Sequence, residues 1–344
     1  TVMKPKHIVV VGSANMDLIM RVSRLPKPGE SLIGSKFMTA HGGKGANQAV
    51  AAARLGANVT FVGCVGNDAF GDLQREGFLK EGINVDYLKT STASPTGTAL
   101  ILLTDSGQNA IVVAPAANHD VLSADIEGLR DLFSQTDMLI SQLEIPLDTV
   151  MSSFGMARSA GVFSILDAGP AQTVPLGLLV AADLVSPNET EAEALTGIEV
   201  NSVDTARHAA ARLLEMGVKH VVMKLGEKGC LYLGEEEIYV PAFSIDAVDT
   251  TAAGDAFTGA LGVAWGSIPL REALQFANAA GALAATVQGA QPSMPTREAL
   301  FDFLEKTFNL PFLKNVFKKL SRVLFNGYNV NVIRTLSKII FKNG

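Results

Sequence analysis

The sequence of 344 residues predicts an α/β fold, namely a Rossmann-like three-layer sandwich in which a mostly parallel central sheet lies between helices. Apolar runs typical of buried strands alternate along the chain with segments of helical pattern, as parallel strands joined by crossover helices require. Hydrophobic residues make up 48% of the chain, which is enough to build the core of one large domain.

The alternation can be followed from the amino terminus. The strand-like run HIVVVG precedes the helical segment ANQAVAAARLG, and VTFVGCVG precedes AFGDLQREGFLKEG; FSILDAG, DLVSPN and HVVMKLG continue the series of strands. Asn47 and Asp68 stand near the predicted helix starts, and Gly56 and Gly82 just past the predicted ends, where these residue types are common. The succession therefore predicts a parallel sheet covered by helices.

Residues 17–41 and 96–114 break this alternation, because their apolar residues recur with a period of two and no helical segment intervenes. The run TGTALILLTDSGQNAIVV predicts a hairpin with its turn at residues 105–108. We expect a small antiparallel sheet that serves as a lid or a dimer surface. The alternative is an embellished edge of the main sheet.

Residues 310–344 differ in composition from the rest of the chain, so we place one domain at residues 1–309 and a basic C-terminal extension of unknown role at 310–344. As a helix, residues 313–324 would carry apolar side chains such as Leu313 on one face and basic ones such as Lys314 on the other. This pattern is compatible with binding to a membrane surface or a partner. An extra docked helix or a sequence artefact would explain it as well.

Charge and cysteine content exclude several classes of protein. The net charge is −6, but residues 310–344 contain seven Lys or Arg and no Asp or Glu, which leaves −13 on residues 1–309. Such an acidic body argues against binding to nucleic acid. The amino terminus lacks the pattern of a signal peptide, and the apolar runs of the domain are shorter than the roughly 20 residues that span a bilayer. Cys64 and Cys230, each in an apolar run, indicate a reducing compartment, so we expect a cytoplasmic protein.

The segment DTTAAGDAFTGALG, residues 249–262, carries the strongest chemical signal. Ala252, Ala253 and Gly254 precede an apolar helix and leave its first backbone amides uncovered. Those amides and the helix dipole can bind a phosphate or the charge that develops during phosphoryl transfer. Asp255 in the first turn could then accept a proton from an attacking hydroxyl. The alternative is a carboxylate that only favours the helix dipole.

Two common phosphate-binding motifs do not occur in the sequence. Gly43 and Lys44 are followed by Gly45 where a P-loop has Ser or Thr, and no GxGxxG follows the first strand. The sequence therefore argues against a P-loop enzyme and a dinucleotide-dependent dehydrogenase.

Three motifs resemble, in the same order, those of the ribokinase family of carbohydrate kinases: GGKGANQA at 42–49, SPNETE at 186–191 and DTTAAGDAF at 249–257. With VVGSANMDL near the start and GAQPSMP near the end, the resemblance covers roughly residues 7–308. It implies ATP-dependent phosphorylation of D-ribose at the 5-hydroxyl, with Asp255 as the base and residues 252–255 as an anion hole. The alternatives are a related kinase for deoxyribose, fructose or a nucleoside, and a sugar-binding regulatory protein without catalysis.

In this family the sugar lies between the lid and the ends of the first strands. The resemblance places there Asn15, Asp17, Gly43, Lys44, Asn47 and Glu144, together with Asp255. Carboxylates and amides suit paired hydrogen bonds with vicinal hydroxyls, and glycines let the backbone approach a small polyol. A helix start for Asn47 and a solvated charge for Lys44 are the structural alternatives.

The resemblance also implies an ATP site with Mg²⁺. The contacts to ATP would be Asn188, Lys224, Gly226, Gly229, Gly254 and Asn278. Glu191 would hold Mg²⁺ directly or through water, since Mg²⁺ prefers oxygen ligands and keeps several waters. Asn188 and Glu191 fit the cap and first turn of a helix equally well. Lys224 departs from the family, in which a small hydroxyl residue is common at this position, although a lysine can pair with phosphate.

Finally, the resemblance implies a K⁺ site beside the anion hole, which would activate the enzyme by ordering that loop. Its oxygens would come from the side chains of Asp249 and Ser293 and from the carbonyls of Thr251, Ala284, Val287 and Gly289. Ordinary turn chemistry is the alternative for Gly289 and Ser293. We also expect a homodimer that pairs through the strands of the lid.

Overall fold

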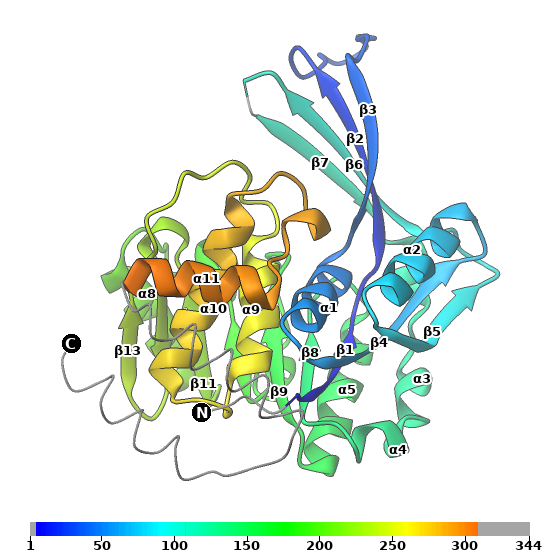
Figure 1. The fold of residues 1–344 in the computed structure, drawn as a ribbon. Coiled ribbons are helices and arrows are strands. Elements are labelled where there is room, and N and C mark those ends of the chain that lie inside the picture. The colour runs from blue at the N-terminus through cyan, green and yellow to red at the C-terminus, as the bar shows by residue number, and fades with distance from the viewer. Residues whose placement is uncertain (1–4, 107, 309–344) are drawn as a thin grey trace.

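The computed structural model describes residues 5–106 and 108–308 and shows a central sheet between two layers of helices (Figure 1). Every neighbouring pair from β11 to β5 in this sheet is parallel, while β12 pairs antiparallel with both β11 and β13. The predicted α/β fold is thereby confirmed. Within the described residues, nine strands form the sheet in the order β13 (Glu237–Val240), β12 (Cys230–Leu233), β11 (His220–Lys224), β10 (Leu184–Ser186), β9 (Phe163–Asp167), β8 (Met138–Ser141), β1 (His7–Val11), β4 (Asn58–Gly66) and β5 (Asn84–Ser91).

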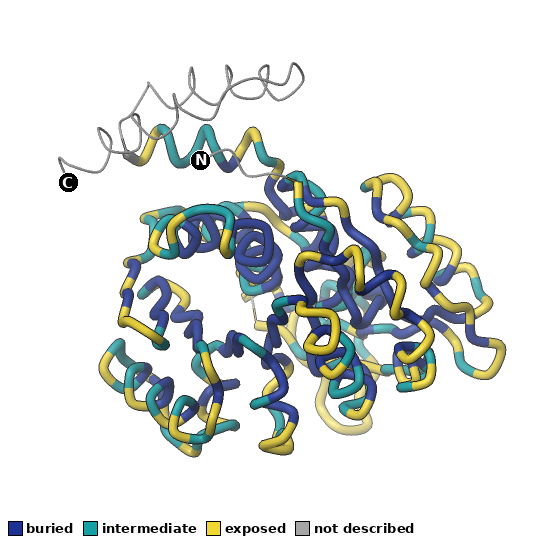
Figure 2. The backbone as a smooth tube through the Cα atoms, turned by 90° about the horizontal axis from the view of Figure 1, so that it is seen from below, coloured by how far each residue is buried: buried dark blue, intermediate teal, exposed yellow. Residues whose placement is uncertain are grey.

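Helices cover both faces of the sheet because its strands are apolar on both sides. Ile8 and Val10 of β1 point into one hydrophobic core, and Val9 and Val11 into the other. Buried residues accordingly lie along the sheet and on the helix faces that meet it (Figure 2). The first core is covered by α1 (Lys44–Arg54), α2 (Ala69–Lys80), α9 (Ala253–Ala264), α10 (Leu270–Ala285) and α11 (Arg297–Phe308), and the second by α3 (Ser123–Glu127), α4 (Arg130–Phe133), α5 (Leu147–Ala160), α6 (Leu176–Leu179), α7 (Glu189–Thr196) and α8 (Val203–Glu215).

The helix boundaries agree with most of the sequence signals. Asp68 caps α2 by accepting a hydrogen bond from the amide of Gly71 at 2.9 Å. Gly56 and Gly82 follow α1 and α2 with φ of 97° and 71°, a left-handed conformation that favours glycine. Asn47 lies one turn inside α1, which begins at Lys44, so its buried side chain is available to the site rather than to the cap.

A second, four-stranded sheet projects from the main one (Figure 1). Its order is β3 (Lys36–Gly42), β2 (Asn15–Val22), β6 (Gly97–Thr104) and β7 (Asn109–Ala114). The outer pairs are antiparallel, as predicted, but the central pair β2–β6 is parallel, which corrects the expectation of a wholly antiparallel sheet. The reason is topological: β2 follows β1 and β6 follows β5, and those two strands run in the same direction in the main sheet.

Two regions singled out in the sequence are not fully covered by the structure. Residue 107, in the turn of the predicted hairpin, and the extension 310–344 lie outside the described residues.

Short 3₁₀ helices occur at Ala116–Asp120, Gly226–Lys228 and Gln291–Ser293. Among residues 5–106 and 108–308, no helix combines the length and apolar character needed to cross a bilayer.

Candidate active site

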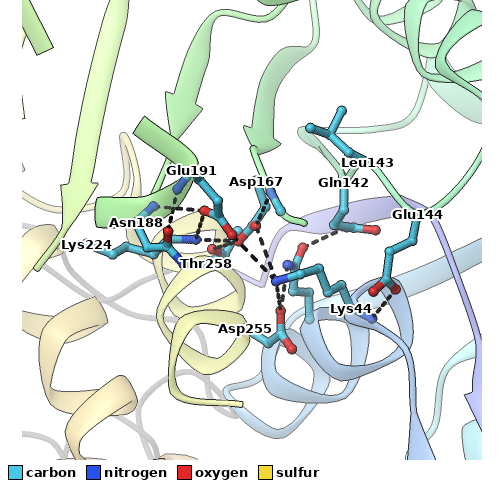
Figure 3. Close-up of polar contacts among 12 residues, drawn as sticks. Lys44, Gln142, Leu143, Glu144, Asp167, Asn188, Glu191, Lys224, Asp255 and Thr258 are labelled. Carbon is cyan, nitrogen blue, oxygen red and sulfur yellow. Dashed lines mark hydrogen bonds and ion pairs between the residues drawn. The ribbon is translucent and has the colours of Figure 1, made fainter. Parts of the chain in front are cut away.

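Charged side chains gather where the carboxyl ends of the central strands meet the first turns of α1, α7 and α9 (Figure 3). Asp167 is the last residue of β9 and Lys224 the last residue of β11, while Glu144 follows β8. Glu191 comes from the first turn of α7, which follows β10. Open parallel sheets bind their ligands outside this edge, so the position alone marks a candidate site.

Asp255 is held by amide side chains from α1. Asn47 Nδ2 donates to its Oδ2 at 2.9 Å, and Gln48 Nε2 donates to its Oδ1 at 3.0 Å. Asp255 is 5% exposed, and burial raises its pKa to about 6; Lys44, with Nζ 4.0 Å from Oδ1, opposes this shift, and Asp167 adds to it. Asp255 is therefore more basic than an ordinary aspartate and still mostly ionised at neutral pH, which suits a general base.

The first turn of α9 presents unpaired backbone amides beside Asp255. The amide of Ala253 donates to the carbonyl of Thr250, but in the described part of the chain the amides of Gly254 and Asp255 have no hydrogen-bond acceptor. A Cβ added at Gly254 would lie 3.8 Å from Lys224 Nζ, so this lysine borders the same turn. Free amides, the helix dipole and an ammonium group together favour an anion here.

Asp167 is the shared partner of two lysines. Its Oδ2 accepts hydrogen bonds from Lys224 Nζ and Thr258 Oγ1, both at 2.7 Å, and its Oδ1 lies 3.9 Å from Lys44 Nζ. Asp167 is fully buried and Lys224 is 8% exposed. Burial alone would raise the pKa of Asp167, but Lys224 and Lys44 outweigh it and keep the carboxylate ionised. Lys44 also lies 3.9 Å from Glu191 Oε1, so it joins three carboxylates.

The predicted sugar residues lie next to this cluster. Glu144 Oε2 accepts a hydrogen bond from the backbone amide of Lys44 at 3.0 Å. The Asn15 side chain accepts one from Asn118 Nδ2 at 2.6 Å. Asn47 Oδ1 is buried and has no partner among the described residues, which leaves an acceptor for a ligand hydroxyl.

Asp17 belongs to the same group of acids. Burial raises its pKa to about 7, and Glu144 and Asp255 add to the shift. Its carboxyl group fits closely against Gly42, because a Cβ there would lie 2.3 Å from Asp17 Oδ1. Gly43 has a φ of 91°, so the backbone that follows needs glycine as well.

Asp17→Asn should raise thermal stability at alkaline pH. The folded pKa lies above the ordinary value of about 4, so the stabilising contribution of Asp17 is present at low pH and is lost as pH rises through about 7. Asparagine does not ionise, so the gain in Tm over the wild type should widen from about pH 4 to 7 and reach about 4 °C or more at pH 8. Calorimetry over this range tests it, with exposed Asp86→Asn as the control. A constant difference in Tm would contradict the assignment.

Apart from Lys224 and Gly254 at the first turn of α9, the predicted nucleotide residues lie in three places. Asn188 caps α7, and it exchanges hydrogen bonds of 2.8 Å with Glu191 in a capping box, which leaves Glu191 Oε1 beside Lys44. Gly226 and Gly229 shape the turn from β11 to β12, where a Cβ at Gly229 would lie 2.1 Å from the carbonyl oxygen of Val240. Asn278 of α10 donates to the carbonyl of Pro241 at 2.8 Å, beside a pocket of about 250 Å³ lined by residues 240–244, Gln275 and Thr307.

The predicted K⁺ ligands lie in and beside two loops, which a hydrogen bond from Gly289 to Asp249 joins. Asp249 accepts hydrogen bonds from Thr251 and, at 3.0 Å, from the amide of Gly289, and its backbone amide donates to Ala285. Burial would raise the pKa of Asp249, but these hydrogen bonds lower it overall, so the carboxylate is ionised. Ser293 instead donates to Ala290 within its own turn. The carbonyl of Ala284 accepts from the amide of Val287 at the end of α10.

Comparison with known proteins identifies the family of this fold and site. The pfkB family carbohydrate kinase profile matches residues 5–297. The chain belongs to this family. Ribokinase of Haemophilus influenzae is 41% identical over 303 residues, which are 87% of this chain and 99% of that protein. The structure of Arabidopsis thaliana ribokinase complexed with ribose and ATP matches with a TM-score of 0.80 at 37% identity, covering 88% of this chain and 99% of that chain. Deoxyribokinase of Salmonella typhi is 34% identical over 304 residues, 86% and 98% of the respective chains.

Some residues in the centre of this carbohydrate kinase were not predicted from its sequence. Asp167, Gln48, Gln142 and Thr258 all lie in the network around Lys224 and Asp255. A usable signal existed for Asp167, because FSILDAG places it at the carboxyl end of a predicted strand, where ligands bind. Gln48 stands within the GGKGANQA motif. Thr258 carried no signal, since it reads as an ordinary residue of an apolar helix.

Proposed function

We propose that this pfkB family kinase transfers the γ-phosphoryl group of ATP to the 5-hydroxyl of D-ribose, giving D-ribose 5-phosphate and ADP. The observation that carries the proposal is Asp255, a buried carboxylate of raised pKa beside free helix amides and two lysines. Ribose as the acceptor is supported by relatives named ribokinase at 36–41% identity. Deoxyribose is the alternative, supported by the deoxyribokinases at 34%.

In the proposed reaction, Asp255 accepts the proton of the 5-hydroxyl while that oxygen forms a bond to the γ-phosphorus. The bond from this phosphorus to the bridging oxygen breaks, and its electron pair leaves with ADP. The anion hole of residues 252–255 binds the oxygens of the transferring group, chiefly through the amides of Gly254 and Asp255, which have no acceptor among the described residues. Lys44 and Lys224 neutralise charge on either side of Asp167.

The sugar would lie between the small sheet and the ends of the strands, in contact with Asn15, Asp17, Gly43, Lys44, Asn47 and Glu144. The unpaired Asn47 Oδ1 supports this position, because a sugar hydroxyl would satisfy it. The nucleotide would follow Gly254 and Lys224 towards Asn188, the turn at Gly226 and Gly229, and Asn278. The pocket beside Asn278 supports an adenosine there.

Glu191 fits a role in holding Mg²⁺, directly or through water, because Mg²⁺ prefers oxygen ligands and Glu191 Oε1 lies 3.9 Å from Lys44 Nζ in the charged cluster. When bound, Mg²⁺ supplies charge neutralisation of the phosphates. In the described part of the chain, no three His, Cys, Asp or Glu residues are grouped to hold a metal ion. Most ligands of Mg²⁺ would therefore be phosphate oxygens and water.

A K⁺ site fits the loops near α9. The ionised Asp249 supports it. The carbonyls of Thr251, Ala284, Val287 and Gly289 and the Ser293 hydroxyl would supply the further oxygen ligands. Bound K⁺ would supply positive charge beside the anion hole. Asp249 already joins the loop of Thr251 to that of Gly289, so a cation there would order the approach to α9.

The test of the function is a comparison of kcat/KM for ribose, deoxyribose, fructose and a nucleoside, measured as ADP release with Mg²⁺ and K⁺. Ribose should give the highest value. A higher value for deoxyribose would shift the assignment to that sugar, and no turnover with any acceptor would favour a regulatory sugar-binding protein. We further propose a cytoplasmic location, supported by the two buried free cysteines.

The small sheet also supports a homodimer. By strand register, Phe37, Leu100 and Val112 share one face, and they are 57%, 48% and 69% exposed. Asp17 is adjacent in β2 to Leu18, the partner of Leu100, and its side chain therefore belongs to the opposite face. Packing of two such apolar faces would remove them from water without covering the sugar side.

Val112→Glu should convert the homodimer to a monomer, because it places a charge on this apolar face at its most exposed large residue. Sedimentation analysis checks the prediction, with Leu79→Glu on α2, where Leu79 is 58% exposed, as the matched control that stays dimeric. A wild-type chain that sediments as a monomer would overturn the proposed pairing.

A further inference from the structure

Two buried glutamines extend the hydrogen-bond network of Asp255 into the protein interior. Gln142 Nε2 donates to Gln48 Oε1 at 2.6 Å, and Gln48 Nε2 donates to Asp255 Oδ1 at 3.0 Å. Both glutamines are fully buried. Gln142 follows β8, Gln48 belongs to α1 and Asp255 to α9, so the chain of bonds joins three parts of the fold. Figure 3 shows Gln142 and Asp255 at the two ends of this chain of bonds.

The order of donors and acceptors in this chain matches an ionised base. A glutamine amide accepts through oxygen and donates through nitrogen, so an oxygen of Gln48 that is occupied by Gln142 leaves its nitrogen for Asp255. A turned Gln48 amide would place its oxygen against the carboxylate and lose both bonds. The Gln142 amide fits in this position only because residue 12 is glycine, since a Cβ there would lie 2.1 Å from Gln142 Oε1.

We propose that Gln48, oriented by Gln142, is a positioning residue that holds Asp255 in the ionised form and fixes the plane of its carboxylate. Asn47 donates to Oδ2 and Gln48 to Oδ1, so each oxygen receives one amide and keeps a free lone pair. The carboxylate therefore cannot rotate without losing both bonds. This inference rests on the proposed function, in which Asp255 accepts the hydroxyl proton.

Other charged groups also face Asp255 and set its protonation. Lys44 of α1 favours the carboxylate, whereas Asp167 at the end of β9 disfavours it. Asp17 of β2 interacts with Asp255 as well. Lys44 lies 3.9 to 4.0 Å from Asp255, Asp167 and Glu191, so its charge is shared among three carboxylates. The hydrogen bond from Gln48 to Asp255 Oδ1 therefore stabilises ionised Asp255 in addition to Lys44.

The test is the pH profile of kcat/KM for ribose in Gln48→Met, Gln142→Met and the double variant. Methionine keeps a similar length but donates no hydrogen bond, so the pKa of Asp255 should rise in Gln48→Met and move the acidic limb up by about 0.5 to 1 pH unit. Gln142→Met should give a smaller shift in the same direction. The double variant should match Gln48→Met, because the two residues act through one bond.

Buried Ser153→Ala of α5 is the control for a loss of stability, and it should leave the limb in place. Equal loss of activity at every pH in Gln48→Met would overturn the inference, as would shifts that add in the double variant. If Gln48→Met does not fold, the limb of Gln142→Met decides. An active wild type with unshifted variants refutes only this inference, whereas a wild type inactive on every sugar refutes the proposed function.

Discussion

Asp255→Asn is expected to lower kcat for ribose by about 10²- to 10⁴-fold, with the dissociation constant for ribose changed only a few-fold. Asparagine keeps the shape but does not accept the hydroxyl proton. Lys44 retains Asp167 and Glu191 as partners at 3.9 Å, so the charge cluster remains paired in the variant. Steady-state kinetics and ribose binding by calorimetry, compared in one preparation, check the result.

Asp72→Asn is the matched control, because Asp72 is an exposed carboxylate in the first turn of α2, as Asp255 is a buried one in the first turn of α9. Loss of a dipole interaction alone costs less than about 1 kcal/mol of stability. Equal and small effects of the two substitutions on kcat would show that Asp255 only favours its helix, the alternative left open by the sequence.

The difference between what the sequence predicts and what it misses follows from how the site is assembled. Asp255 and the amides before it are local to one segment, so the small residues and the apolar helix of 249–262 predict them. The alternation of strands and helices likewise predicts the main sheet. The parallel pairing of β2 with β6 is not local, because it depends on the directions of β1 and β5 in a sheet not yet formed.

The same distinction applies to side chains. Asp167, Lys224 and Thr258 lie in three separate elements, and their shared hydrogen bonds appear only when β9 and β11 end at the same edge beside α9. Gln48 and Gln142 are 94 residues apart in the chain, so no spacing in the sequence indicates their bond.

Variants of Lys224 and Asp167 should show separately how this ion pair affects catalysis and stability. Lys224→Met leaves Asp167 buried with Thr258 and the more distant Lys44, so we expect a loss of about 3 to 5 kcal/mol in the free energy of unfolding. Adding Asp167→Asn removes the uncompensated charge and should recover most of that stability. The ammonium group borders the free amides of α9, so kcat/KM for ATP should fall by about 10²-fold or more in Lys224→Met.

The double variant decides between the two roles of Lys224. If Lys224 binds the transferring phosphoryl group, the double variant regains stability in urea unfolding but stays as slow with ATP as Lys224→Met. If Lys224 only neutralises Asp167, activity returns together with stability. Lys224→Thr with Asp167→Asn is the second double variant, because threonine supplies a hydroxyl group without a charge. Full activity there would mean that a hydroxyl and a neutral partner can replace the buried ion pair, and that the pair serves the fold of this chain rather than the chemistry.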